Sequence, residues 1–317
     1  MNSISRRSFL KTTALGLAAT SAATLTRTTV QAANPIVREG KPRLLLSLAA
    51  YSFRDFFKDQ RNGQKPKVDA DKQIDMTKFV DYCAEHECDG AEVTSYFFPQ
   101  NVSTDDLIQL RRHAFLRGIA ISGGAVGNNF THPKGEKRDA EIKGVKEWID
   151  RYAVLGAPHI RVFAGQYKEQ QKEEVEKNVI SALEEVCDYA GKKGIFLGLE
   201  NHDSIGDSKN LLALVRAVNS DWLGVNLDTG NFRTDDPYYD IQQTLPYAVN
   251  IQLKAEIGRG AAKAGEKAVT EPLDLPRVTK MIRKSGYQGY VALEYEAKED
   301  PMTAVPVLLK RMKQAFA

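Results

Sequence analysis

Short apolar stretches alternate with longer amphipathic stretches along most of this chain. In the longer stretches apolar residues recur every three or four positions, which is the period of an α-helix with one buried face. Val175, Val179, Leu183 and Val186 form one such series. The short stretches have the length and apolar character of buried strands. Eight strands are predicted, over residues 44–53, 90–98, 119–127, 159–165, 195–202, 223–232, 249–257 and 289–297.

The order of these elements predicts the fold class. Eight strand–helix repeats favour a single-domain α/β fold, the closed (β/α)8 TIM barrel, which builds its site at the carboxyl ends of the strands. An open, doubly wound sheet would carry a glycine-rich phosphate loop after its first strand, whereas the chain there reads AYSFRDFFKD. Two long loops, 54–72 and 127–139, follow the first and third strands and are expected at the face that carries the site.

The first 33 residues differ in kind from the rest. A basic start with Arg6 and Arg7 leads into a short apolar stretch and then into the small residues of VQAA. This layout resembles a twin-arginine export signal, which implies cleavage near Ala32 or Ala33 and a periplasmic or otherwise exported protein. The expected organisation is this signal at 1–33, a linker at 34–43 and the barrel at 44–317.

Removal of the signal changes the charge of the chain. The sequence has 44 Lys and Arg against 41 Asp and Glu, and four of those bases but no acids lie in the signal. The 40 bases and 41 acids that remain give a net charge near −1, which argues against a nucleic-acid-binding surface. No later stretch is long and apolar enough to span a membrane. The cysteines Cys83, Cys88 and Cys187 favour buried free thiols, with a Cys83–Cys88 bridge as the alternative.

The fifth to eighth predicted strands all end in polar residues. Side chains alternate along a strand, so every second residue shares a face, and the residues between these polar ones are apolar. The polar residues are therefore expected to point together into the mouth of the barrel. They are Gly198, Glu200 and His202; Asn226 and Asp228; Gln252, Lys254 and Glu256; and Glu294 and Glu296, with Gly198 as the small residue of the set.

A divalent cation would satisfy these strand ends together. Buried polar groups without partners are costly, and the oxygens of Glu200, Asp228, Gln252 and Glu294 could all bind one ion. An all-oxygen set favours Mn²⁺ or Mg²⁺ over Zn²⁺. The alternative is a ring of salt bridges with Lys254 and Arg161.

Further side chains are candidates for substrate contact. Glu92 and Arg161 are expected to point inward from the second and fourth strands, either toward substrate hydroxyl groups or as a buried Arg–Glu pair. Tyr51 and Phe130 belong to a group of aromatics near the mouth that could stack on a sugar. His202 could act as a base or serve as a hydrogen-bonded spacer.

Four short motifs carry a resemblance to a known family. GLEN at Glu200, NLDTGN at Asp228, IQLK at Gln252 and ALEYE at Glu294 resemble, in order and strand position, the xylose isomerase-like barrels of the sugar isomerase/epimerase group, which includes endonuclease IV. The resemblance covers nearly the whole chain after the signal and implies that these four residues hold one metal ion. Gln252 stands where the ketose epimerases of the group have a His ligand, and Asn231 where they have a substrate-contacting His.

The resemblance also implies an activity. Glu200 and Glu294 would double as acid and base in removing a proton next to a carbonyl group of an unphosphorylated sugar, with Lys254 and His202 as electrophilic helpers. The expectation is a metal-dependent isomerase or epimerase. A 3-keto-glycoside lyase that works by β-elimination, or a non-catalytic sugar-binding barrel, are the alternatives. Endonuclease IV-like hydrolysis is disfavoured because its trinuclear zinc site is rich in His, whereas this chain has five. The sequence leaves the oligomeric state open.

Overall fold

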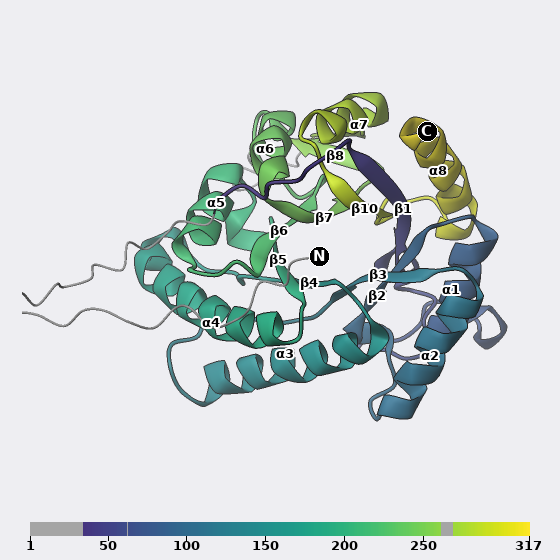
Figure 1. Cartoon of the computed structure of the whole chain (residues 1–317), viewed down its shortest axis with the longest axis horizontal. Coiled ribbons are helices and arrows are strands. Elements are labelled where there is room, and N and C mark those ends of the chain that lie inside the picture. Colours follow the sequence, from purple (N-terminus) through teal and green to yellow (C-terminus); the bar gives the residue numbers. More distant parts are fainter. Residues whose placement is uncertain (1–33, 62, 261–268) are drawn as a thin grey trace, which may run out of the picture. The chain divides into compact units, whose positions relative to one another are not determined.

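The computed structural model describes residues 34–61, 63–260 and 269–317. The predicted export signal at 1–33 lies outside the described residues. The predicted TIM barrel is confirmed: eight parallel strands close on themselves, with β1 pairing to β10, and Figure 1 shows the helices around them. The barrel strands are β1 (Arg43–Ala49), β2 (Gly90–Thr94), β3 (Ala120–Ala125), β4 (His159–Val162), β5 (Phe196–Glu200), β6 (Leu223–Asp228), β7 (Ala248–Leu253) and β10 (Gln288–Leu293).

The helices begin with side-chain caps at several strand-to-helix loops. Ser103 and Asp106 form a capping box at the start of α2, and Asp207 caps α5. The α-helices are α1 (Met76–Glu85), α2 (Thr104–Leu116), α3 (Glu136–Leu155), α4 (Lys172–Lys192), α5 (Ser208–Ala217), α6 (Pro237–Thr244), α7 (Leu275–Lys284) and α8 (Pro301–Phe316). The 3₁₀ turns are η1 (Ala50–Phe53), η2 (Ala70–Lys72), η3 (Ser95–Phe97), η4 (Glu169–Gln171), η5 (Asp203–Ile205) and η6 (Leu245–Tyr247).

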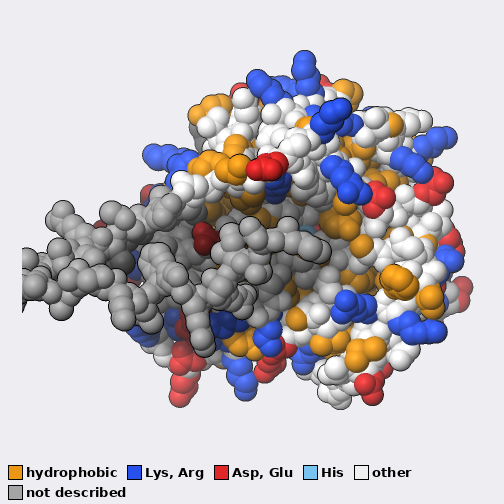
Figure 2. Space-filling view, in the orientation of Figure 1, with side chains coloured by type: hydrophobic (Ala, Val, Ile, Leu, Met, Phe, Trp, Pro, Cys, Tyr) orange, Lys and Arg blue, Asp and Glu red, His pale blue; other side chains and the backbone are white. Residues whose placement is uncertain are grey.

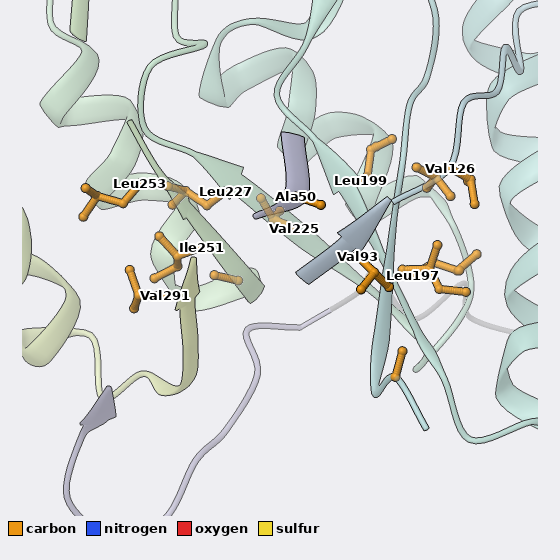
Figure 3. Packing of buried hydrophobic residues seen from close by; sticks show 14 of the residues in the cluster. Ala50, Val93, Val126, Leu197, Leu199, Val225, Leu227, Ile251, Leu253 and Val291 are labelled. Carbon is orange, nitrogen blue, oxygen red and sulfur yellow. The ribbon is translucent and has the colours of Figure 1, made fainter. Parts of the chain in front are cut away.

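Apolar strand residues fill the layer between the barrel and its helices. Leu197 and Leu199 on β5, Val225 and Leu227 on β6 and Ile251 on β7 are fully buried, and Figure 3 shows them along neighbouring strands. These are the alternate positions that the sequence pattern assigned to the helix side. The polar residues between them consequently point into the barrel.

All eight strand predictions ran two to four residues past the observed carboxyl ends, and at β7 the difference is structural. The stretch 249–257 is not one strand, because β7 ends at Leu253 and the chain then enters a short antiparallel hairpin. Strands β8 (Glu256–Arg259) and β9 (Val269–Pro272) form that hairpin, which follows directly on the carboxyl end of β7. The hairpin therefore lies beside the expected site.

The predicted linker contacts the barrel where it is described. The backbone N–H of Ile36 donates to the carbonyl of Pro246 at 2.9 Å, and Arg38 donates to the carbonyl of Ala248, the first residue of β7, at 2.6 Å. The Arg38 guanidinium also lies 4.9 Å from the centre of the Tyr287 ring. These contacts attach the segment before β1 to the amino end of the barrel.

Two further expectations concern thiols and membranes. Cys83, Cys88 and Cys187 are all buried free thiols, so the favoured alternative is the one observed. Among the described residues, no helix combines the length and the apolar character that crossing a membrane would require.

Candidate active site

The polar strand ends lie together inside the carboxyl end of the barrel. Glu200 and Asp228 are the last residues of β5 and β6, Gln252 is the penultimate residue of β7, and Glu294 directly follows β10. At most 5% of any of these four residues is exposed. Side chains this deeply buried need partners, and two cations supply most of them.

Lys254 is the first of these cations. Its ammonium nitrogen lies 3.1 Å from Asp228 Oδ2 and 2.5 Å from Glu294 Oε2, and it also pairs with Glu296. Burial alone would lower the pKa of Lys254, but Asp228, Glu294 and Glu296 together raise that pKa well above its usual value. The lysine is therefore a fixed positive charge and not a neutral amine nucleophile.

Glu296 was expected to point into the mouth of the barrel with Glu294, but no catalytic or binding role was predicted for it. Both residues follow the end of β10, two positions apart, and the alternation that selected Glu294 also points to Glu296. Its side chain is 37% exposed, whereas that of Glu294 is 7% exposed. Glu296 is thus the carboxylate on this side of the site that solvent and small molecules can reach.

Arg161 is the second cation, and its partner is Glu200. Arg161 Nε lies 2.9 Å from Glu200 Oε2, while its Nη1 donates to the carbonyl of Val126 at 2.8 Å. Asn231 Nδ2 donates to the other oxygen of Glu200 at 2.9 Å. Burial raises the pKa of Glu200 to about 7, even though the neighbouring guanidinium opposes the rise. Together these residues form a charged layer: Arg161, Glu200, Asp228, Lys254, Glu294 and Glu296.

A second group of polar residues, the amide layer, forms a hydrogen-bonded ring next to the charged layer, and its Asn226 and Asn250 lie two residues before Asp228 and Gln252, which pair across β6 and β7. It consists of Glu92, Asn226, Asn250 and Gln252. Glu92 accepts from Asn250 Nδ2 and from Gln252 Nε2, each at 2.6 Å. Asn226 closes the ring, since it accepts from Asn250 at 2.8 Å and donates to Gln252 Oε1 at 2.6 Å. The possible Glu92–Arg161 pair is therefore not formed, because each residue has another partner.

The four residues predicted to bind a metal ion do not fit that role as they lie here. Gln252 turns its amide nitrogen toward Glu294 Oε1, at 3.3 Å, while its oxygen accepts from Asn226. Glu200 is paired with Arg161, and Asp228 and Glu294 with Lys254. In the described ranges, no group of three or more His, Cys, Asp or Glu side chains is arranged to hold a metal ion. The arrangement observed is the alternative, a set of salt bridges around Lys254 and Arg161.

Three predicted contact residues lie at the edge of the site or outside it. Phe130 is only 1% exposed, so the expectation that it offers a stacking face for a sugar is not met. The side chain of His202 is 40% exposed and packs on Phe163, which in turn contacts Arg161. Tyr51 is half-buried beside Phe97, and its pKa is raised by burial and by the negative charge of Glu296.

A cavity of about 180 Å³ opens over the charged layer. Lys254, Glu296 and Asn231 line it, together with Arg233 from the loop after β6 and Glu256 from the hairpin. The volume is smaller than the ~300–1,000 Å³ of sites for drug-sized ligands, so it suits a compact polar molecule. A larger hollow of about 490 Å³ lies at α1 and α2 and includes none of the charged layer.

Comparison with known proteins places the chain in a family. The model of the family described as xylose isomerase-like TIM barrel matches residues 80–315, about three-quarters of the sequence. The chain belongs to this family. An uncharacterized protein from Methanocaldococcus jannaschii, MJ1311, is 22% identical over 247 residues, which cover 74% of this chain and 83% of that protein.

Solved structures share the fold at low sequence identity. The 3-keto-D-glucoside 4-epimerase from E. coli is 15% identical with a TM-score of 0.63, covering 86% of this chain and 100% of its own. D-Psicose 3-epimerase with D-tagatose, from Clostridium cellulolyticum H10, is 15% identical with a TM-score of 0.62, covering 86% and 96%. A xylose isomerase-like barrel from Mycobacterium smegmatis in complex with magnesium is 18% identical with a TM-score of 0.63, covering 86% and 98%.

Proposed function

We propose that this barrel is an isomerase or epimerase that removes a proton from the carbon next to a carbonyl group of an unphosphorylated sugar. The observation that carries the proposal is the charged layer, in which carboxylates and two cations lie buried at the ends of neighbouring strands beneath a cavity. Such chemistry needs a base and a positive group beside the developing oxyanion. The sugar epimerases among the structures that share the fold agree with this assignment.

Lys254 and Glu296 are the groups best placed to act on a bound sugar. Both line the cavity, and they touch one another. Glu296 would take the proton, the electron pair of the C–H bond would form the enediolate double bond, and Lys254 would stabilise the negative charge on the former carbonyl oxygen. Return of the proton to the other face gives an epimer, and return to the adjacent carbon gives an isomer.

Glu200 and Glu294 were predicted to be acid and base, and the structure puts them behind the groups that line the cavity. Asn231 donates a hydrogen bond to Glu200. The pKa of Glu200, about 7, suits a group that exchanges a proton near neutral pH. Glu294 supports Lys254. The predicted manganese or magnesium has no part in these steps, because the donor set as it lies does not fit the ion.

The preference for an unphosphorylated sugar rests on charge and on the predicted export. The cations of the cavity, Arg233 and Lys254, are accompanied there by Glu256 and Glu296, which would repel a phosphate. On the face shown in Figure 2, acidic and basic side chains are interspersed. The twin-arginine-like signal would place the protein outside the cytoplasm, where sugar phosphates are scarce, and this location remains part of the proposal.

The test follows hydrogen exchange at the sugar. The full chain is mixed in D₂O with a free ketose, and separately with a 3-keto-glucoside, and proton NMR is recorded with and without added Mn²⁺. Deuterium uptake with formation of a new epimer or isomer is expected. Release of the aglycone would instead establish the lyase, since the enediolate then expels its β-substituent. Neither change, in folded protein, would contradict the assignment and favour a non-catalytic binding barrel.

An ion pair on the outside of the barrel also provides a matched control for that assay. Lys313 is a surface lysine paired with Glu87 on the outside of the barrel. Lys313→Ala should retain the full exchange rate, whereas Lys254→Met should lose it. Equal rates in the two variants would show that the exchange does not depend on the charged layer.

A further inference from the structure

We propose that Lys254 takes the place of the divalent cation in this barrel, so that the site holds its carboxylates together without a bound metal ion. The inference rests on the proposed function for the role of that positive charge in the reaction. The occupancy of the site can nevertheless be tested without any substrate.

The ammonium lies where an ion shared by these carboxylates would have to lie. Asp228 Oδ2 and Glu294 Oε2 are 3.1 Å and 2.5 Å from Lys254 Nζ, and Glu296 approaches from a third direction. An ion such as Mg²⁺ needs its oxygen ligands at about 2.0–2.1 Å in a nearly octahedral arrangement. Among the described residues Asp228 Oδ2 accepts no hydrogen bond, and the cation it faces is this lysine.

Gln252 is held in the wrong orientation for a ligand. Rotating its amide by 180° would bring its oxygen toward the carboxylates of Glu92 and Glu294, and its NH₂ group toward the NH₂ group of Asn226. Each exchange replaces a hydrogen bond with repulsion between like groups inside the barrel. The amide layer therefore keeps the nitrogen of Gln252, which cannot bind a cation, pointed at the site.

The lysine is also packed into its position. A Cβ atom added at Gly230 would lie 2.6 Å from Lys254 Cγ, so the glycine leaves the space that the lysine stem occupies. The backbone N–H of Lys254 donates to Thr229 Oγ1 at 2.9 Å, and its side chain is only 8% exposed. The residues after β6 thus hold the Lys254 side chain in place. A surface lysine, by contrast, could change its rotamer and make room for an ion.

The test measures manganese in the folded protein. Full-length wild type, Lys254→Met and Lys254→Arg are dialysed at ~0.1 mM Mn²⁺, enough to fill a site of micromolar affinity, and bound metal is counted by mass spectrometry. Wild type and Lys254→Arg should retain less than ~0.1 ion per chain, while Lys254→Met, which leaves three carboxylates without a cation, should retain about one. The thermal midpoint of Lys254→Met alone should rise with Mn²⁺.

Each result is decisive. One manganese per wild-type chain would overturn the proposal, and so would a Lys254→Met variant that folds and binds none, since the lysine would then not be what fills the place of the ion. Should Lys254→Met unfold in dialysis, refolding with Mn²⁺ but not without it would support the proposal, and failure in both leaves the wild-type count to decide. Sugar turnover by metal-loaded wild type would uphold the proposed function while refuting this inference.

Discussion

The two polar layers inside the barrel differ in how they satisfy their hydrogen-bonding groups. In the amide layer one carboxylate, Glu92, meets neutral amides in a closed ring of short hydrogen bonds. In the charged layer four carboxylates face Lys254 and Arg161, and exposure rises to 37% at Glu296. On β6 the two layers are supplied two residues apart, by Asn226 and Asp228. One step along this strand therefore separates a residue that orders the barrel from a residue of the charged layer.

Gln252 connects the layers. Its amide nitrogen donates to Glu92 below and to Glu294 above, at 2.6 Å and 3.3 Å. Because Gln252 is neutral, it holds these two carboxylates in position without adding a charge to either layer. Disturbing the lower layer should thus reduce stability first, and disturbing the upper layer should reduce activity first. The following predictions separate these effects, from the largest to the smallest.

Glu92→Ala should give the largest loss of stability. It leaves the amides of Asn250 and Gln252 without their acceptor in a fully buried place, which should lower the free energy of unfolding by about 3–5 kcal/mol. Urea denaturation followed by circular dichroism measures this loss. The control is Glu173→Ala, an exposed helix residue paired with Lys177, for which a change within about 0.5 kcal/mol is expected. Similar midpoints for both variants would contradict a structural role for the amide layer.

Lys254→Met should give the largest loss of activity. Without the positive charge beside the developing oxyanion, the rate of deuterium uptake by the sugar should fall by about 10²–10³-fold, or ~3–4 kcal/mol of transition-state stabilisation. Proton NMR in D₂O at saturating sugar measures it. Lys254→Arg should recover part of the rate because it restores the charge in a different shape. A rate within twofold of wild type for Lys254→Met would remove Lys254 from the mechanism.

The stability of the charged layer should depend on pH through Glu200. Burial raises its pKa in the folded protein to about 7, above its ordinary value of 4.5, so its contribution to stability is present below pH 4.5 and is lost as the pH rises through 7. Between pH 4.5 and 7.5, the free energy of unfolding of the wild type should fall by up to about 3 kcal/mol relative to that of Glu200→Gln, which cannot ionise. Paired urea melts across this range test the difference, and a difference independent of pH would contradict it.

Asn231→Ala should have the smallest effect. It removes one hydrogen bond of 2.9 Å to Glu200 and leaves the ion pair between Glu200 and Arg161 in place. The free energy of unfolding should therefore fall by about 1 kcal/mol. Asn178→Ala, which removes a bond to the carbonyl of Thr131 outside the charged layer, is the matched control for stability. Only Asn231→Ala should also change the apparent KM for the sugar, since Asn231 lines the cavity. Equal KM values would place Asn231 outside substrate binding.

The fold and the direction of the inward side chains could be predicted from the sequence because both depend on local periodicity. The alternation along 195–202 and 223–232 is enough to point Glu200 and Asp228 into the barrel, whatever the rest of the chain does. The pairing of charges could not be predicted in the same way. Whether Arg161 reaches Glu92 or Glu200 depends on side-chain length and on depth across the barrel, which no strand pattern contains.

Aromatic and loop residues were harder to place for a related reason. Phe130 lies in the loop after β3, where its backbone N–H donates to the carbonyl of Ala164 in the segment that follows β4, and its ring is buried. The start of β8 was merged into β7 because the stretch 249–257 keeps its alternation past Lys254. Periodicity thus identifies the strands but does not show where a strand leaves the barrel wall.

The pairing of β1 with β10 also sets an order of events during synthesis. Arg43 pairs with Gln288, so one edge of the first strand stays open until almost the whole chain has left the ribosome. Contacts this distant form late, and an open edge invites association with other chains. The same late segment carries Glu294 and Glu296, the counter-charges of Lys254. A nascent or truncated chain without this segment therefore has an open barrel and a Lys254 that lacks two of its carboxylate partners. Both are supplied when the last strand and the residues after it are added.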